Sequence, residues 1–199
     1  MKLRKLALLS AAAAGIAFGT PAIANSLTFQ DVTFQTQALD SDTLQLSILN
    51  ATNASGDWTG VTHLKAFEIK DIGTVTGANI VSGPAGTYTQ TVDAGLAATL
   101  GCTTGGTNGA CFSATSPLAL TDSMVWTIDF VGTLDFSAPH LKLQFLTGAD
   151  ATDKTGSLLS QAIPAIPEPE TYAMMLVGFS LLGFVARRRK QGLGNVVPA

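Results

Sequence analysis

The stretch that decides the fold is Met124–Val131, MVWTIDFV, in which two sets of side chains alternate residue by residue. One set is strongly apolar and holds Met124, Trp126, Ile128 and Phe130. The other set contains Thr127 and Asp129. Successive side chains of a β-strand point to opposite faces, so this spacing predicts a half-buried strand with Trp126 in the core.

Working outward, the same period of two recurs in segments far apart in the chain. Its inward positions are Leu44, Leu46 and Ile48 in one segment and Leu141, Leu143 and Phe145 in another. Weaker strands are expected over 64–69, 78–81 and 88–92, with turn-forming residues between them. Seven or eight short strands without a sustained helical period predict an all-β ectodomain, an antiparallel sandwich or a jelly-roll-like fold.

Two segments depart from simple alternation. The apolar phase slips by one position between Leu27–Phe29 and Val32–Phe34, which predicts a β-bulge or a strand that crosses between sheets. The segment 92–100, VDAGLAATL, is compatible with one or two helical turns.

The N-terminus has the three parts of a secretory signal peptide. Lys2, Arg4 and Lys5 precede an apolar run over 6–18, and Ala22-Ile23-Ala24 forms an A-x-A cleavage site. We expect residues 1–24 to be the signal peptide and Asn25 to be the first mature residue. A retained transmembrane helix is the alternative, but the apolar run is short for one and ends in Gly19-Thr20-Pro21.

The C-terminal part has three elements in a fixed order: Pro167-Glu168-Pro169, the uncharged segment 171–186, and Arg187-Arg188-Arg189-Lys190. The two prolines keep the triplet extended and open to a processing enzyme. The 16 residues of 171–186 span about 24 Å as a helix, short of the hydrocarbon core of about 30 Å. The four cations are typical of a stop-transfer cluster and predict that 191–199 is a short cytoplasmic tail.

These three elements together resemble the PEP-CTERM sorting signal of bacterial surface proteins, over roughly 165–190. One departure is the tail, which continues past the basic cluster to Ala199. The resemblance implies an exosortase-type processing enzyme as partner, transient anchoring in the inner membrane by a transmembrane helix over 171–186, and cleavage near Pro167-Glu168-Pro169. It also implies delivery to the cell surface or to an exopolysaccharide matrix.

The expected organisation is a signal peptide (1–24), a β-sandwich ectodomain (25–160), a linker (161–166), the sorting signal (167–190) and the tail (191–199). Seven of the eleven basic residues lie in the two targeting segments. Between Asn25 and Ile166 there remain four lysines against twelve acidic residues, a net charge of −8. Such a body repels nucleic acid, so no nucleic-acid partner is expected.

Cys102 and Cys111 are the only cysteines and enclose TTGGTNGA, whose glycines allow the loop to turn back. In an exported protein this pair predicts a structural disulfide. A metal or redox pair is the alternative, but no histidine lies nearby and the spacing is not C-x-x-C.

Catalytic motifs are missing from the sequence. Only His63 and His140 are available as histidine bases, and no G-x-S-x-G motif is present. Paired carboxylates for glycoside hydrolysis stay open, because sequence does not reveal spatial pairs. We expect a non-enzymatic protein without a cofactor, and a hydrolase is the less favoured alternative.

Two binding hypotheses remain. Asp40 and Asp42 in one loop, and Asp150 and Asp153 in another, are weak calcium candidates because neither loop matches the D-x-D-x-D-G pattern. Trp58 beside Asp57 lies in a turn-rich segment, where an exposed ring next to a carboxylate would suit a sugar. The alternative for Trp58 is burial at one end of the sandwich.

We therefore expect a secreted, disulfide-stapled surface protein with a structural or adhesive role in exopolysaccharide or biofilm. A carbohydrate-binding module of the matrix, with Trp58 as its contact, is the main alternative.

Overall fold

The computed structural model describes residues 24–97, 101–105, 108–150, 159–166, 175–176, 178–180 and 182. The body is all-β, as predicted. Its strands are β1 (Ala24–Phe29), β2 (Val32–Ala38), β3 (Thr43–Leu49), β4 (His63–Lys70), β5 (Gly73–Ser82), β6 (Tyr88–Val92), β7 (Ala94–Ala97), β8 (Gly101–Thr104), β9 (Ala110–Ala119), β10 (Ser123–Leu134), β11 (His140–Leu146) and β12 (Leu159–Ala162). Two single-turn 3₁₀ helices, η1 (Ala51–Asn53) and η2 (Gly56–Trp58), connect β3 to β4.

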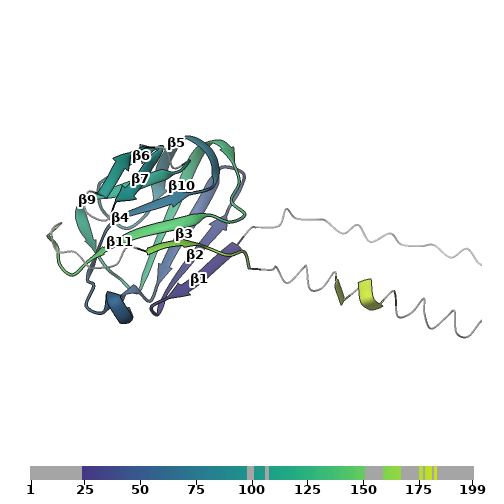
Figure 1. The fold of residues 1–199 in the computed structure, drawn as a ribbon, viewed down its shortest axis with the longest axis horizontal. Coiled ribbons are helices and arrows are strands. Elements are labelled where there is room, and N and C mark those ends of the chain that lie inside the picture. Colours follow the sequence, from purple (N-terminus) through teal and green to yellow (C-terminus); the bar gives the residue numbers. More distant parts are fainter. Residues whose placement is uncertain are drawn as a thin grey trace, which may run out of the picture.

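Two antiparallel five-stranded sheets pack face to face (Figure 1). Sheet A has the order β1-β2-β3-β10-β5, and sheet B has the order β12-β11-β4-β9-β6. A separate two-stranded sheet consists of β7 and β8. Two of the four neighbouring pairs in sheet A and three of the four in sheet B are distant in sequence, so the sandwich closes through long-range pairing.

The alternation predicted for β10 is confirmed. Met124, Trp126, Ile128 and Phe130 are all buried between the sheets. In the neighbouring strand β3, Leu44, Leu46 and Ile48 point to the same interior, since Trp126 is opposite Leu46 in the register. Burial of large apolar side chains on one face of each sheet is the main stabilising contribution in such a layered fold.

The phase slip between Leu27–Phe29 and Val32–Phe34 is a hairpin turn, so the predicted β-bulge or strand crossing is wrong. Phe29 pairs directly with Val32. Between them Gln30 and Asp31 have positive φ angles of 50° and 64°. Two such residues match the two-residue hairpin turn whose twist suits antiparallel strands. Because two turn residues separate Phe29 from Val32, the inward positions change from odd-numbered residues in β1 to even-numbered residues in β2.

The expected helical turns over 92–100 are also wrong for the residues described there. Val92 ends β6, and Ala94–Ala97 is strand β7, paired with β8. Ala94 and Leu96 are buried in a small cluster with Ala66 and Cys111, separate from the main core. Their inward positions two residues apart fit a strand.

The predicted linker 161–166 belongs to the fold. β12 pairs with β11, and beyond it Ile163 is completely buried in the main core. This strand was not predicted because it is short and is closely followed by Pro164. The body therefore extends beyond residue 160.

The predicted transmembrane helix 171–186 lies largely outside the described residues. Among those that are described, no helix is both long enough and apolar enough to span a membrane.

Candidate processing site

The two ends of the body meet at one place. Ala24–Ser26 begins β1, an edge strand of sheet A, and Pro164–Ile166 follows β12, an edge strand of sheet B. Asn25 and Ala165 form an antiparallel bridge. The Ser26 amide donates to the Pro164 carbonyl oxygen (3.1 Å), and the Ile166 amide donates to the Ala24 carbonyl oxygen (2.8 Å). We call this pairing of 24–26 with 164–166 the terminal bridge.

Asn25 anchors the N-terminal side of the terminal bridge. Its side chain is only 1% exposed. Nδ2 donates to Thr36 Oγ1 (3.2 Å) in β2 and to the carbonyl oxygen of Phe136 (3.1 Å), which lies between β10 and β11. Because buried polar groups must be hydrogen-bonded to avoid a desolvation penalty, these two bonds hold the start of β1 in position.

Ile163 anchors the C-terminal side. Its side chain is fully buried, and its amide donates to the Pro139 carbonyl oxygen (2.9 Å). Leu159, at the start of β12, is buried as well. Main-chain pairing thus continues to Ile166, and the next residue in the sequence is Pro167.

The sequence-predicted processing residues lie on both sides of this boundary. Ala24, the expected signal cleavage residue, is the first residue of β1. Ala22, Pro167, Glu168, Pro169, Arg187, Arg188, Arg189 and Lys190 lie outside the described residues. The structure therefore describes the body from Ala24 to Ile166, next to each expected cut, but not residues 1–23 or the triplet itself.

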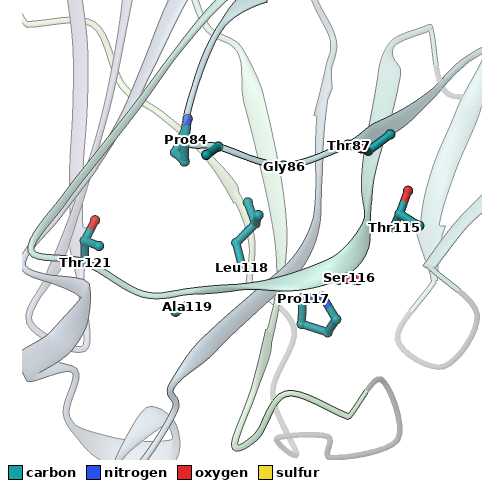
Figure 2. A pocket seen from close by; sticks show the side chains of 10 residues that line it. Pro84, Gly86, Thr87, Thr115, Ser116, Pro117, Leu118, Ala119 and Thr121 are labelled. Atoms are coloured by element: carbon teal, nitrogen blue, oxygen red, sulfur yellow. The ribbon is translucent and has the colours of Figure 1, made fainter.

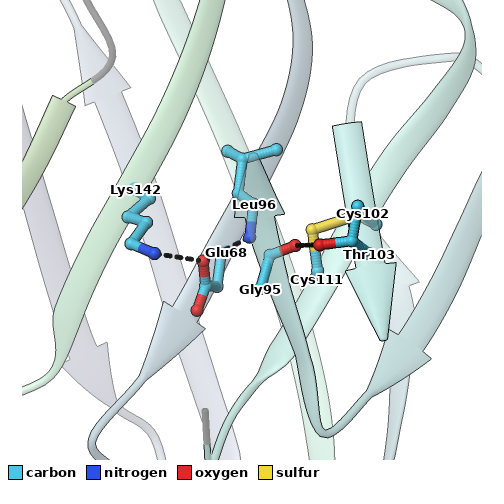
Figure 3. Close-up of a disulfide and its surroundings, with 7 residues drawn as sticks. All are labelled: Glu68, Gly95, Leu96, Cys102, Thr103, Cys111 and Lys142. Carbon is cyan, nitrogen blue, oxygen red and sulfur yellow. Dashed lines mark hydrogen bonds and ion pairs between the residues drawn. A yellow bond between two sulfur atoms is a disulfide. The ribbon is translucent and has the colours of Figure 1, made fainter. Parts of the chain in front are cut away.

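The predicted disulfide is confirmed. Cys102 in β8 is bonded to Cys111 in β9, with a Cα–Cα distance of 5.6 Å. Figure 3 shows that this bond ties the β7–β8 hairpin to the adjacent strand. The hairpin lies on sheet B and contacts β4 and β9.

Sequence analysis missed Glu68, a fully buried carboxylate under this hairpin. Its Oε2 accepts a hydrogen bond from the Leu96 amide (2.6 Å) and lies 3.2 Å from Lys142 Nζ (Figure 3). Glu68 occupies the position between inward-facing Phe67 and Ile69, so alternation places it on the outer face of sheet B. Only the hairpin, which comes later in the chain, converts that outer position into a buried one.

Trp58 is buried, which is the alternative to the candidate sugar contact. Its side chain has no exposed area, and the ring contacts Phe29, Phe34 and Phe145 in edge-to-face geometry. The Trp58 amide donates to Gln30 Oε1 (3.0 Å), which fixes η2 against the β1–β2 turn. Asp57 is exposed, but no aromatic face of Trp58 is available for a sugar beside it.

The aspartates of the first calcium candidate stabilise their own turn. Asp40 Oδ1 accepts the amides of Asp42 (3.0 Å) and Thr43 (2.7 Å). These bonds, the Asp42 amide foremost, lower the pKa of Asp40 to about 2, while the side-chain hydrogen bond to Asp40 raises the pKa of Asp42. Asp150 is described but Asp153 is not, and no group of three or more potential metal ligands gathers among the described residues.

His140 lies between a serine and an aspartate, as the general base of a serine hydrolase does. Its contacts also connect elements of the fold. Its Nε2 lies 2.9 Å from Ser160 Oγ, and its Nδ1 lies 3.6 Å from Asp71 Oδ2. Burial, followed by the charge of Lys70, lowers the pKa of His140. Ser160 lies in β12 and His140 in β11, so their contact joins these two strands.

A shallow groove of about 510 Å³ lies elsewhere on the body. Figure 2 shows Leu118 at its floor, with Pro84 and Gly86 on one side and Thr115, Ser116 and Thr121 along β9 and the turn after it. Among the described residues, no ionisable side chain lines this groove. Its surface of hydroxyl groups and small apolar groups can contact a neutral ligand but holds no acid or base.

The described body is an all-β sandwich whose main-chain pairing ends at Ile166. Residues 165–190 match the PEP-CTERM protein-sorting motif. The chain thus carries a PEP-CTERM sorting motif, which indicates export and sorting to the cell surface by an exosortase. The match covers the sorting segment, and no curated protein or solved structure matches the chain.

Proposed function

We propose that the β-body is a non-enzymatic, structural or adhesive component of an exopolysaccharide or biofilm matrix. It is exported with a leader cut after Ala24, held transiently in the inner membrane, and released by a cut at or after Pro167. The observation that carries this proposal is that the body closes directly before the sorting triplet, where the Asn25–Ala165 bridge and the bond from the Ser26 amide to Pro164 remain after the leader cut. A cut at the sorting triplet would therefore leave every strand of the described sandwich in place.

The intact mass of the protein isolated from the matrix of its own host tests the two cuts. We expect an N-terminus at Asn25 and a C-terminus at or after Ile166, with any excess mass identifying a transferred group. Released protein that still contains 171–186, or that ends before Ile163, would contradict the proposal.

The matrix role needs a separate experiment. A strain lacking the chain should form biofilm with less retained polysaccharide, and the wild-type gene should restore it. The double variant Pro167→Ala/Pro169→Ala is the control, because it keeps the body but alters the sorting motif. An unchanged matrix in the deletion strain would contradict the structural role.

Polysaccharide binding is the second candidate, now without Trp58 as its contact. The groove beside Leu118 supports it, since hydroxyl groups and apolar atoms together suit a neutral sugar. Retention of the purified protein on polysaccharide columns, reduced by Ser116→Arg but not by Gln37→Arg on sheet A, would support this candidate. Equal retention of both variants would remove the groove as the contact.

We propose that Ser160, His140 and Asp71 connect strands and do not catalyse. The His140–Asp71 separation of 3.6 Å is longer than a hydrogen bond, and the groove described above is lined by other residues. A fluorophosphonate probe tests this directly, because it labels activated serines. Labelling of the wild type that disappears in Ser160→Ala would establish a hydrolase in place of a purely structural protein.

A further inference from the structure

The expected leader cut falls inside a paired strand. The bond to be cut joins Ala24 to Asn25, the first two residues of β1. On one side these residues pair with Gln37 and Thr36 of β2. On the other side Ala24 accepts the Ile166 amide and Asn25 is opposite Ala165. Both edges of the strand are occupied, so no main-chain edge is left for a peptidase to pair with.

Burial adds to this occlusion. The residue immediately after the cut, Asn25, is 1% exposed and donates two hydrogen bonds to Thr36 and Phe136. Moving the bond into an active site would require β1 to leave β2, the terminal bridge to open and the Asn25 amide to lose both acceptors. Proteolysis of such a segment follows the population of the open state, which is small when the segment is buried and paired.

We infer that leader removal must come before 159–166 docks, so that the order is leader cut, closure of the body by β12 and the terminal bridge, and sorting cut. This order rests on the proposed leader site after Ala24. The C-terminal segment is the last part of the body to be synthesised. Before it arrives, β1 is the edge strand of sheet A and pairs only with β2, so its outer edge is unpaired and the start of the strand can open locally. This interval keeps the leader site open.

Leader removal also changes the other side of the bridge. Cleavage after Ala24 removes the carbonyl group that accepts the Ile166 amide, while the bond from Ser26 to Pro164 remains. Ile166 is the residue directly before the sorting triplet. The first cut therefore loosens the chain next to the second cut, which favours the same order.

The test uses the full-length precursor in detergent micelles with its disulfide formed. One sample is folded before a purified bacterial signal peptidase is added, and the other is diluted from denaturant directly into the peptidase. Appearance of the Asn25 N-terminus is followed by mass spectrometry. We expect the folded precursor to be cut at least about tenfold more slowly, because cutting waits for opening.

Two matched variants separate local docking from general stability. Ile163→Ala removes a buried side chain from the C-terminal anchor, and Leu96→Ala removes one from the β7–β8 hairpin. We expect Ile163→Ala to accelerate cutting of the folded precursor and Leu96→Ala to leave it nearly unchanged. Equal rates for folded and denatured wild type, or equal acceleration by both variants, would overturn the inferred order. A cut elsewhere in the denatured precursor would instead overturn the proposed leader site, and the inference with it.

Discussion

Trp58 shows how one side chain changes role with its surroundings. Its sequence context of Ser55, Gly56 and Gly60 is typical of an exposed turn. In the structure the turn is η2, and it places the indole among three phenylalanine rings. The indole Nε1 is buried without a hydrogen-bond partner among the described residues. The ring therefore contributes to stability through apolar packing.

Replacing Trp58 separates packing from the unpaired N–H group. We expect Trp58→Ala to lower the free energy of unfolding by about 3–5 kcal/mol, because it leaves a large cavity in a rigid core. Trp58→Phe should cost clearly less, since it retains a ring and removes the unpaired donor. Urea unfolding followed by circular dichroism measures both. A loss below about 1 kcal/mol for Trp58→Ala would contradict full burial of the ring.

Asp40 and Asp42 predict opposite pH dependences of stability. Asp40 has a lowered pKa of about 2, so its carboxylate stabilises the fold above its unfolded pKa near 3.8, and this contribution is lost as the pH falls toward 2. The stability gap between wild type and Asp40→Ala should therefore close between about pH 4 and pH 2. The pKa of Asp42 is raised, so its contribution is present at low pH and is lost as the pH rises.

Thermal unfolding of both variants across this pH range is the measurement. Asp42→Ala is the control for Asp40→Ala, because the two residues share one exposed turn. Parallel pH profiles for the two variants would show that the hydrogen bonds from Asp42 and Thr43 to Asp40 do not control its titration.

At the scale of elements, the β7–β8 hairpin depends on three connections to the rest of the body. They are the Cys102–Cys111 disulfide, the bond from the Leu96 amide to Glu68, and the cluster of Ala94 and Leu96 with Ala66. Glu68 also forms an ion pair with Lys142 of β11. The hydrogen bond from the Leu96 amide therefore links the hairpin directly to this buried carboxylate.

Removing the disulfide should weaken the body without abolishing its fold. We expect Cys102→Ala/Cys111→Ala to lower the free energy of unfolding by about 2–3 kcal/mol, since the bridge closes a short loop in the unfolded chain. Hydrogen exchange should then increase at the Leu96 amide, which depends on the docked hairpin. If the Leu96 amide of this variant exchanged hydrogen at the wild-type rate, Glu68 and the apolar cluster would be sufficient to hold the hairpin without the disulfide.

At the scale of the whole molecule, the last strand decides where the body ends. β12 and Ile163 complete one edge of sheet B, and the terminal bridge joins that edge to sheet A. The residues that close the sandwich therefore overlap the first two residues of the sorting motif, which matches from residue 165.

Two truncations locate the end of the body. A chain that stops after Ile166 should retain a cooperative unfolding transition close to that of the longer protein. A chain that stops after Ser160, the boundary expected from sequence alone, loses buried Ile163 and the terminal bridge and should unfold at clearly lower urea concentration. Urea titration of both chains measures the difference. Equal midpoints would mean that 161–166 is a linker after all.

Local patterns determined much of this protein. Alternation along Met124–Val131 identified the inward face of β10, the two cysteines predicted the disulfide, and the order of triplet, apolar segment and cations identified the sorting signal. Each of these depends on residues close together in the chain. Their geometry or chemistry is set by short-range spacing, which sequence shows directly.

Only the tertiary structure decided the burial of Trp58 and Glu68, the docking of β12, and the pairing of Asn25 with Ala165. Each depends on partners that are far away in sequence, such as Phe145 for Trp58 and Leu96 for Glu68. A turn tryptophan is exposed or buried according to which strands close over it, and a short segment before a proline becomes a strand when a free sheet edge accepts it. Long-range pairing supplies that information, and local spacing does not contain it.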